Sequence, residues 1–94
     1  MNVSRTVRIT NRRGLHARAS AKFVTLASEL PIEVHVAKAG SGDGAESVTG
    51  TSIMGLMMLG AAPGDSITIS ASGDGADAAV SALCDLVESK FGED

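Results

Sequence analysis

A single histidine among arginines near the start of the chain is the strongest candidate for chemistry. His16 stands in the stretch "NRRGLHARAS", close to Arg12, Arg13 and Arg18. A neutral imidazole nitrogen can attack phosphorus, and an arginine beside it can balance charge in the transition state. Gly14 allows an unusual backbone angle, or a close approach of another chain, just before this histidine. The pattern indicates phosphoryl transfer, but the spacing alone also fits an ordinary surface histidine beside a helix cap.

The residues that follow predict that a helix begins at or beside His16. Apolar residues recur at helical spacing over residues 19–30, and Pro31 ends the pattern. The first backbone N–H groups of this helix, those of Ala17 and Arg18, have no partner within the helix, so we expect them to be free to bind a phosphate. The positive end of the helix dipole also favours a neutral ring at this position. The N-terminus of this predicted helix would therefore supply both a site for an anion and, in His16, a nucleophile.

Charge divides the chain unevenly. Residues 1–28 carry +6 with no acidic residue, whereas residues 29–94 carry −9. An arginine-rich, acid-free start also occurs in organellar transit peptides, but Val3, Val7 and Ile9 alternate with polar residues as in a strand. We therefore expect a folded segment whose basic surface meets a phosphoryl group or an acidic protein.

Other classes of function find little support in the sequence. We expect no metal, because His35 lies on a distant predicted strand and no third ligand clusters with it. No apolar run approaches the roughly 18 residues of a membrane span. The lone cysteine, Cys84, excludes an internal disulfide and favours a reducing cytoplasm. It falls on the apolar stripe of the last predicted helix, where we expect a small buried side chain.

Hydrophobic periodicity predicts one domain, residues 1–94, with the order βαββαβα. Strands are predicted over residues 2–10, 32–37, 46–50 and 67–71, and helices over 17–30, 52–59 and 76–91. A glycine-rich hairpin is expected over residues 38–47. Four strands with three helices on one face make a two-layer α+β domain.

The stretch "TSIMGLMMLG" predicts a short helix, residues 52–59, capped by Ser52 and closed by Gly60. Methionines at this spacing usually belong to a core, but an exposed Met-rich surface also suits a protein with several partners. A phosphate on Ser52 would meet the helix dipole and alter the neighbouring apolar surface. Ser52 is therefore a candidate for regulation as well as a helix cap.

Taken together, the segments "GLHARAS", "AKF", "TSIMGLMMLG" and "ITISASGDGADAA" resemble the histidine-containing phosphocarrier proteins, the HPr family of the phosphoenolpyruvate-dependent phosphotransferase system. The resemblance covers nearly the whole chain in the same order. It implies an open-faced two-layer sandwich with a four-stranded antiparallel sheet. It also implies a phosphocarrier without a cofactor, not an enzyme.

The resemblance implies that His16 accepts a phosphoryl group on Nδ1 from enzyme I and passes it to an enzyme IIA-type domain. Arg18 matches the arginine beside the phosphohistidine, and Ser52 matches a serine that an ATP-dependent kinase modifies and a phosphorylase restores. The apolar patch that docks partners corresponds to Ile53, Met54, Leu56 and Met57. The relay would serve sugar uptake or the nitrogen-related branch. We expect a cytoplasmic monomer that binds neither nucleic acid nor membrane. The alternative is a regulatory adaptor whose phosphorylation state selects its protein partners.

This chain departs from the family pattern in three places. Ala19 replaces the proline that usually follows the active-site arginine and would pre-set the first helical turn. Thr51 precedes Ser52, where a basic residue is common, which weakens the regulatory assignment. The hairpin at residues 38–47 is longer than the usual tight turn.

Overall fold

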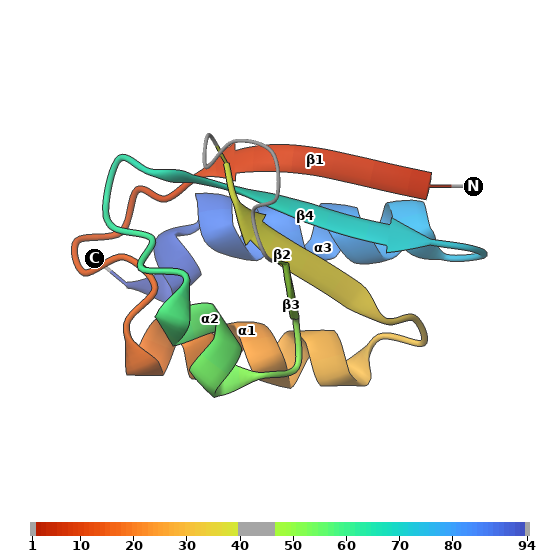
Figure 1. Ribbon diagram of the computed structural model, residues 1–94, viewed down its shortest axis with the longest axis horizontal. Coiled ribbons are helices and arrows are strands. Elements are labelled where there is room, and N and C mark those ends of the chain that lie inside the picture. Colours follow the sequence, from red (N-terminus) through yellow and green to blue (C-terminus); the bar gives the residue numbers. More distant parts are fainter. Residues whose placement is uncertain (1, 40–46, 94) are drawn as a thin grey trace.

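The computed structural model describes residues 2–39 and 47–93 and consists of a sheet covered on one side by helices (Figure 1). The elements follow the predicted order βαββαβα, with a short 3₁₀ turn at the end. Their bounds are β1 Asn2–Arg8, α1 Ala17–Glu29, β2 Val34–Lys38, β3 Val48–Thr49, α2 Ile53–Met58, β4 Ser66–Ser72, α3 Ala76–Glu88 and η1 Lys90–Gly92. The predicted α+β fold class is confirmed. Within the described residues, none of the helices is long and apolar enough to cross a membrane.

The sheet is antiparallel throughout, with the strand order β1-β4-β2-β3. Its register pairs Val7 with Ile67 across β1 and β4, and Val36 with Ile69 across β2 and β4. Because successive side chains of a strand point to opposite faces, these apolar residues all face the helices. The other face carries polar side chains, such as the hydrogen-bonded hydroxyls of Thr6 and Thr68, 2.9 Å apart.

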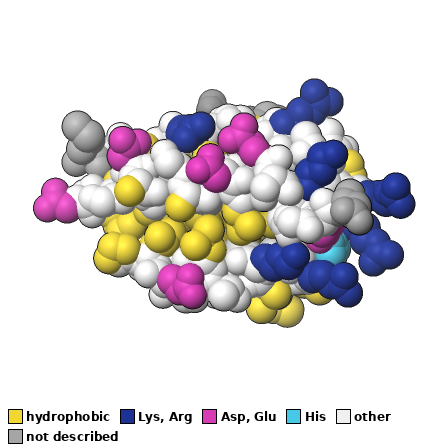
Figure 2. Space-filling model, turned by 180° about the vertical axis from the view of Figure 1, so that it is seen from behind, with side chains coloured by type: hydrophobic (Ala, Val, Ile, Leu, Met, Phe, Trp, Pro, Cys, Tyr) yellow, Lys and Arg dark blue, Asp and Glu magenta, His cyan; other side chains and the backbone are white. Residues whose placement is uncertain are grey.

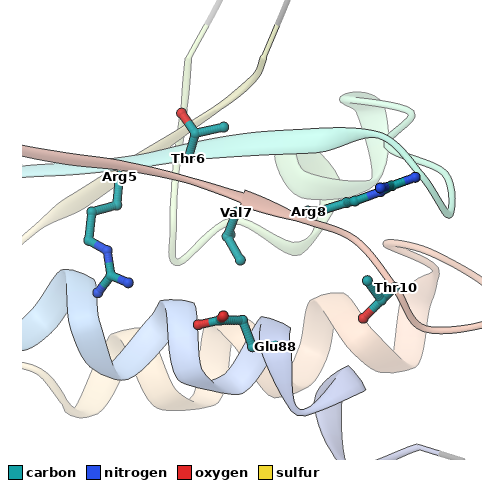
Figure 3. A pocket seen from close by; sticks show the side chains of 6 residues that line it. All are labelled: Arg5, Thr6, Val7, Arg8, Thr10 and Glu88. Atoms are coloured by element: carbon teal, nitrogen blue, oxygen red, sulfur yellow. The ribbon is translucent and has the colours of Figure 1, made fainter.

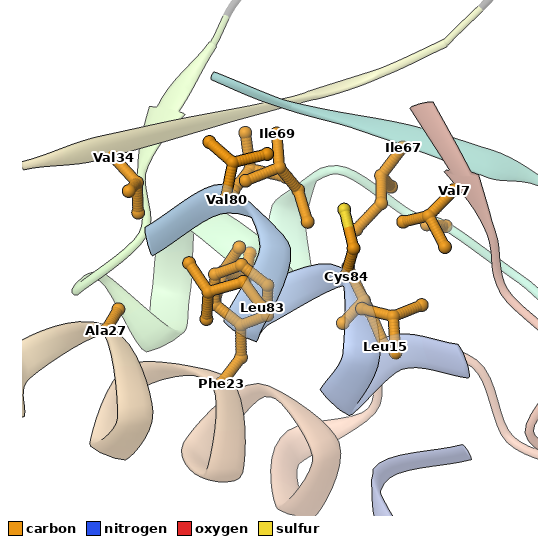
Figure 4. Close-up of a cluster of buried hydrophobic side chains, with 14 of the residues drawn as sticks. Val7, Leu15, Phe23, Ala27, Val34, Ile67, Ile69, Val80, Leu83 and Cys84 are labelled. Carbon is orange, nitrogen blue, oxygen red and sulfur yellow. The ribbon is translucent and has the colours of Figure 1, made fainter. Parts of the chain in front are cut away.

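The core lies between the sheet and the helices (Figure 4). Phe23 of α1, Leu83 of α3 and Ile69 of β4 are fully buried there. Cys84 of α3 is also buried, as predicted, and burial raises the pKa of its thiol. Apolar residues at helical spacing on two helices and at alternate positions on the strands therefore meet in one layer.

Four predicted boundaries need correction. β2 begins at Val34, two residues after its predicted start. β1 ends at Arg8, although Ile9 stays buried and its N–H donates to the Asp65 carbonyl at 2.8 Å. β3 is confined to Val48–Thr49 within the predicted segment 46–50, and residues 40–46 of the predicted hairpin lie outside the described residues.

The last helix, predicted over residues 76–91, ends at Glu88. Lys90 and Phe91 take positive φ angles of 61° and 56°, which a right-handed helix does not allow. The side chain of Phe91 is buried nonetheless, with 1% exposed. The apolar spacing of Phe91 therefore predicted its burial correctly, but the prediction that its backbone is helical was wrong.

Candidate functional site

His16 is the N-cap of α1, as predicted, and its ring closes the cap. The backbone is extended there (φ −74°, ψ 179°), and His16 Nδ1 accepts a hydrogen bond from the Arg18 N–H at 3.2 Å. The His16 carbonyl accepts the N–H of Ser20 at 2.9 Å, which begins the helix ladder. Because Nδ1 is an acceptor, it carries no proton in this arrangement, and its lone pair receives this hydrogen bond.

The other ring nitrogen contacts a carboxylate from the far end of the chain. His16 Nε2 lies 2.8 Å from Glu93 Oε2, and the side-chain amide of Asn11 donates to Glu93 Oε1 at 3.1 Å. Since Nδ1 has the acceptor role, Nε2 carries the hydrogen and donates it to the carboxylate. The hydrogen bond from Asn11, followed by that from His16, lowers the pKa of Glu93 below its usual range. This carboxylate is therefore ionised at neutral pH.

Glu93 and Asn11 were not among the residues singled out from the sequence. Glu93 is 77 positions from His16, and no local pattern connects the two. Asn11 is fully buried and also donates to the Gly14 carbonyl at 2.8 Å, so it links the loop before α1 to the end of the chain. The only sequence signal was the position of Asn11 at the start of the "NRRGLHARAS" stretch.

Gly14 takes the unusual backbone angle predicted for it, and the close approach comes from a segment of the same chain rather than from another chain. Its φ is +66°, in the left-handed region, and a Cβ placed there would lie 2.6 Å from the Ala61 carbonyl oxygen. The next residue, Leu15, donates its N–H to the same carbonyl at 3.0 Å. This contact holds the loop that carries His16 against the segment that follows α2.

Positive charge surrounds the ring at one end of the molecule. A shallow hollow of about 290 Å³ is lined by Arg12, Arg13, His16, Arg18 and Glu93. In Figure 2, Lys and Arg side chains gather around a histidine at one end of the face shown. Three guanidinium groups against one carboxylate leave the hollow net positive, which suits a phosphoryl group. Among the described residues, no group of three or more His, Cys, Asp and Glu side chains could hold a metal ion.

One detail of the predicted anion site is wrong. The Arg18 N–H was expected to be free, but it donates to His16 Nδ1. A phosphoryl group bonded to Nδ1 would take the lone pair that this N–H now contacts, so the donor would then become available to a phosphoryl oxygen. Ala17 is the first residue of α1, so its N–H has no acceptor within the helix.

Ser52 caps α2, as predicted: its hydroxyl oxygen accepts the Gly55 N–H at 3.0 Å. Beside it, an apolar patch is exposed on the helix, and we call these residues the α2 patch: Ile53, Met54, Met57 and Met58. Met58, the most exposed at 80%, was not among the predicted docking residues. The segment after α2 contacts the loop before His16 through Ala61, so the helix that carries the α2 patch is tied to the histidine loop.

The prediction that Leu56 docks partners is wrong, because its side chain is fully buried. At 100° per residue, Leu56 points away from the arc shared by the four exposed residues. α2 packs this side against α1, where Leu56 joins the core.

The second histidine lies apart from this site. His35 stands on β2, 43% exposed, with its ring 3.4 Å from Glu33. A second hollow, of about 300 Å³, lies between β1 and α3, where the Arg5 and Val7 side chains point toward α3 (Figure 3). It includes Glu88 but neither histidine. Another hollow includes His35 but no Lys or Arg side chain, so His35 does not share the arginines that line the hollow at His16.

Comparison with known proteins agrees with this architecture. A histidine at a helix N-terminus, within a hollow lined by three arginines, is suited to carry a phosphoryl group. Residues 3–89 match the family model for the PTS HPr component phosphorylation site. The chain therefore belongs to the HPr family of phosphocarrier proteins of the phosphotransferase system.

Individual relatives match over nearly their whole length. The chain is 45% identical over 91 residues to phosphocarrier protein HPr of Neisseria meningitidis, with 97% of each chain covered. It is 41% identical over 91 residues to phosphocarrier protein NPr of Shewanella violacea, covering 97% of this chain and 94% of that protein. The crystal structure of HPr-C-His from Thermoanaerobacter tengcongensis superimposes with a TM-score of 0.84 at 42% identity, covering 98% of both chains.

Proposed function

We propose that His16 accepts a phosphoryl group on Nδ1 from phosphorylated enzyme I and passes it to an enzyme IIA-type domain. The observation that carries this proposal is the tautomer that the hydrogen bonds select. Nε2 donates to Glu93 at 2.8 Å and Nδ1 accepts from the Arg18 N–H at 3.2 Å, so the nucleophilic lone pair is on Nδ1. Membership of the HPr family supports the same reaction.

The transfer conserves atoms and charge without a cofactor. The Nδ1 lone pair forms a bond to phosphorus while the bond between phosphorus and the donor breaks, and its electron pair returns to the donor. In the second transfer, the N–P bond breaks and its pair returns to Nδ1. Arg18, with Arg12 and Arg13, can neutralise the phosphoryl oxygens, and the Ala17 and Arg18 N–H groups can donate to them.

Partners would dock on the α2 patch, with Ser52 as a site of regulation. The α2 patch is an adaptable apolar surface that is exposed. Its helix is followed directly by the segment that contacts the histidine loop through Ala61. Modification of Ser52 by a serine kinase, reversed by a phosphorylase, would add charge at the edge of this surface. We also propose that the protein acts in the cytoplasm as a monomer.

The relatives do not separate the two branches of the relay. The chain resembles an NPr and an HPr protein at similar identities, 41% and 45%. The alternative function, a regulatory adaptor, would use the same α2 patch. The histidine favours the carrier, because an adaptor does not need a nucleophile with its tautomer set by two hydrogen bonds.

The deciding experiment is phosphorylation by enzyme I and phosphoenolpyruvate. The wild-type protein should form an acid-labile, base-stable adduct, and His16→Ala should form none. His35→Ala is the matched control and should react like the wild type, because its ring faces the opposite side of the sheet. Labelling of the His16→Ala protein at the wild-type rate, or loss of labelling in a folded His35→Ala protein, would overturn the assignment.

A further inference from the structure

The end of the chain forms a turn of unusual handedness. Lys90, Phe91 and Gly92 have successive φ angles of 61°, 56° and 74°, so three residues in a row are left-handed. Glycine adopts this conformation freely, whereas Lys and Phe do so only under strain. Strain of this kind persists where the surrounding structure holds it, and it often accompanies function.

Several contacts hold the turn in place. Phe91 is buried in the core with 1% exposed, and its carbonyl accepts a hydrogen bond from Lys22 Nζ at 2.7 Å. The Glu93 N–H donates to the Lys90 carbonyl at 2.9 Å. The turn is thereby tied to α1, the helix that His16 caps.

The result of this turn is the position of one carboxylate. Glu93 follows the left-handed residues directly, and its Oε2 lies 2.8 Å from His16 Nε2. Asn11 holds the other oxygen, Oε1, at 3.1 Å. The carboxylate is thus held at both oxygens, on the side of the ring away from the nucleophilic Nδ1.

We propose that Glu93 is a positioning residue for the discharge of phosphorylated His16, in that its carboxylate keeps the proton on Nε2 of the phosphorylated ring. The proposal rests on the proposed function, because it requires a phosphoryl group on Nδ1. It extends that function from acceptance of the phosphoryl group to its release.

The proton on Nε2 decides which leaving group the ring becomes. After Nδ1 has bonded to phosphorus, a ring that retains Nε2–H is a cation. When the acceptor's lone pair bonds to phosphorus, the N–P bond breaks, its electron pair returns to Nδ1, and neutral imidazole leaves. A ring that has lost the Nε2 proton would have to leave as an imidazolate anion, a far poorer leaving group. Glu93 takes no proton in this step and only accepts the hydrogen bond.

The positive charges around the ring explain why a carboxylate matters at this position. Arg12, Arg13 and Arg18 line the same hollow, and the positive charge of Lys22 acts on Glu93. These cations stabilise the phosphoryl group but oppose a positive charge on the ring. Among the residues that line the hollow, Glu93 is the anion that faces the ring, so it adds to the negative charge of the phosphoryl group in favouring the Nε2 proton.

The experiment follows the hydrolysis of the phosphorylated protein, with water as the acceptor. Wild type, Glu93→Gln, Glu93→Asp and Glu29→Gln are charged with enzyme I and phosphoenolpyruvate, and phosphate release is measured from pH 5 to pH 10. Gln keeps the shape and an acceptor oxygen but removes the charge. Glu29, at the opposite end of α1, is a control for the loss of one negative charge. The ¹⁵N chemical shift of Nε2 in phosphorylated His16 reports the proton directly.

For Glu93→Gln, we expect the midpoints of hydrolysis and of the Nε2 shift to fall by about one pH unit. Above the midpoint, release should then be roughly 10-fold slower, because one pH unit is a tenfold change in the protonated fraction. Glu93→Asp should recover part of the shift, and Glu29→Gln should match the wild type. A Glu93→Gln protein whose Nε2 titration and hydrolysis midpoint are unchanged would overturn the role of Glu93. Failure of the wild type to be phosphorylated at His16 would instead overturn the proposed function.

Discussion

Replacement of Gly14 by alanine tests how the histidine loop is held. The new methyl group would lie 2.6 Å from the Ala61 carbonyl oxygen and 3.0 Å from the Ala62 Cα. These neighbours are backbone atoms, so they can separate only if the loop moves away from the segment after α2. The Ala61 carbonyl also accepts the Leu15 N–H at 3.0 Å, and this movement would stretch that hydrogen bond.

The expected loss has two parts. A left-handed backbone costs a non-glycine residue about 1–2 kcal/mol. Forcing a methyl group into a packed contact adds roughly 1–3 kcal/mol. We therefore expect Gly14→Ala to lower the free energy of unfolding by about 2–5 kcal/mol. For a domain of this size, each 1 kcal/mol corresponds to about 4–8 °C in Tm, so the effect is easily measured.

Gly60→Ala is a matched control. Gly60 has nearly the same φ, +67°, but a Cβ there would meet no atom within 4 Å. It should therefore lose only the backbone part, about 1–2 kcal/mol. Urea denaturation of the wild type, Gly14→Ala and Gly60→Ala separates the cost of the left-handed backbone from the cost of the packed contact. Equal losses for Gly14→Ala and Gly60→Ala would refute the close contact as the reason for glycine at position 14.

Two further substitutions test the site itself. Arg18→Ala should slow phosphorylation of His16 by roughly 10²-fold, the scale for loss of one transition-state donor, with little loss of stability because Arg18 is exposed. Arg8→Ala is the control. An unchanged rate for Arg18→Ala would mean that the backbone N–H groups and the helix dipole stabilise the transition state without Arg18. Ser52→Asp should fold normally, because a carboxylate can also accept the Gly55 N–H, yet it should slow phosphorylation by enzyme I more at low salt than at high salt. Ser52→Ala, which lacks the charge, should react at the wild-type rate, and equal rates for Ser52→Asp at both ionic strengths would leave Ser52 a plain helix cap.

Features that depend on neighbouring residues were predictable from the sequence. His16 and Ser52 both cap helices because a cap is formed with N–H groups two or three residues further on. Gly14 was recognised because left-handed turns and close contacts both favour a residue without a Cβ. Alternating and helical apolar spacing likewise indicated the strands, the helices and the buried Cys84. Each of these depends on periodicity or on a hydrogen bond that spans only a few residues.

Other features were decided by the tertiary structure alone. Leu56 and Met58 are apolar neighbours on one short helix, and only the packing of α2 against α1 buries the first and exposes the second. Phe91 continues the apolar spacing of α3, but its side chain reaches the core from a left-handed turn and not from the helix. That turn brings Glu93 to His16 across 77 positions of sequence. The histidine proposed as the nucleophile and the helix that presents it could therefore be predicted from the sequence, because both arise from local geometry. The carboxylate that selects the tautomer was determined only when the segment after α3 packed against the loop before α1.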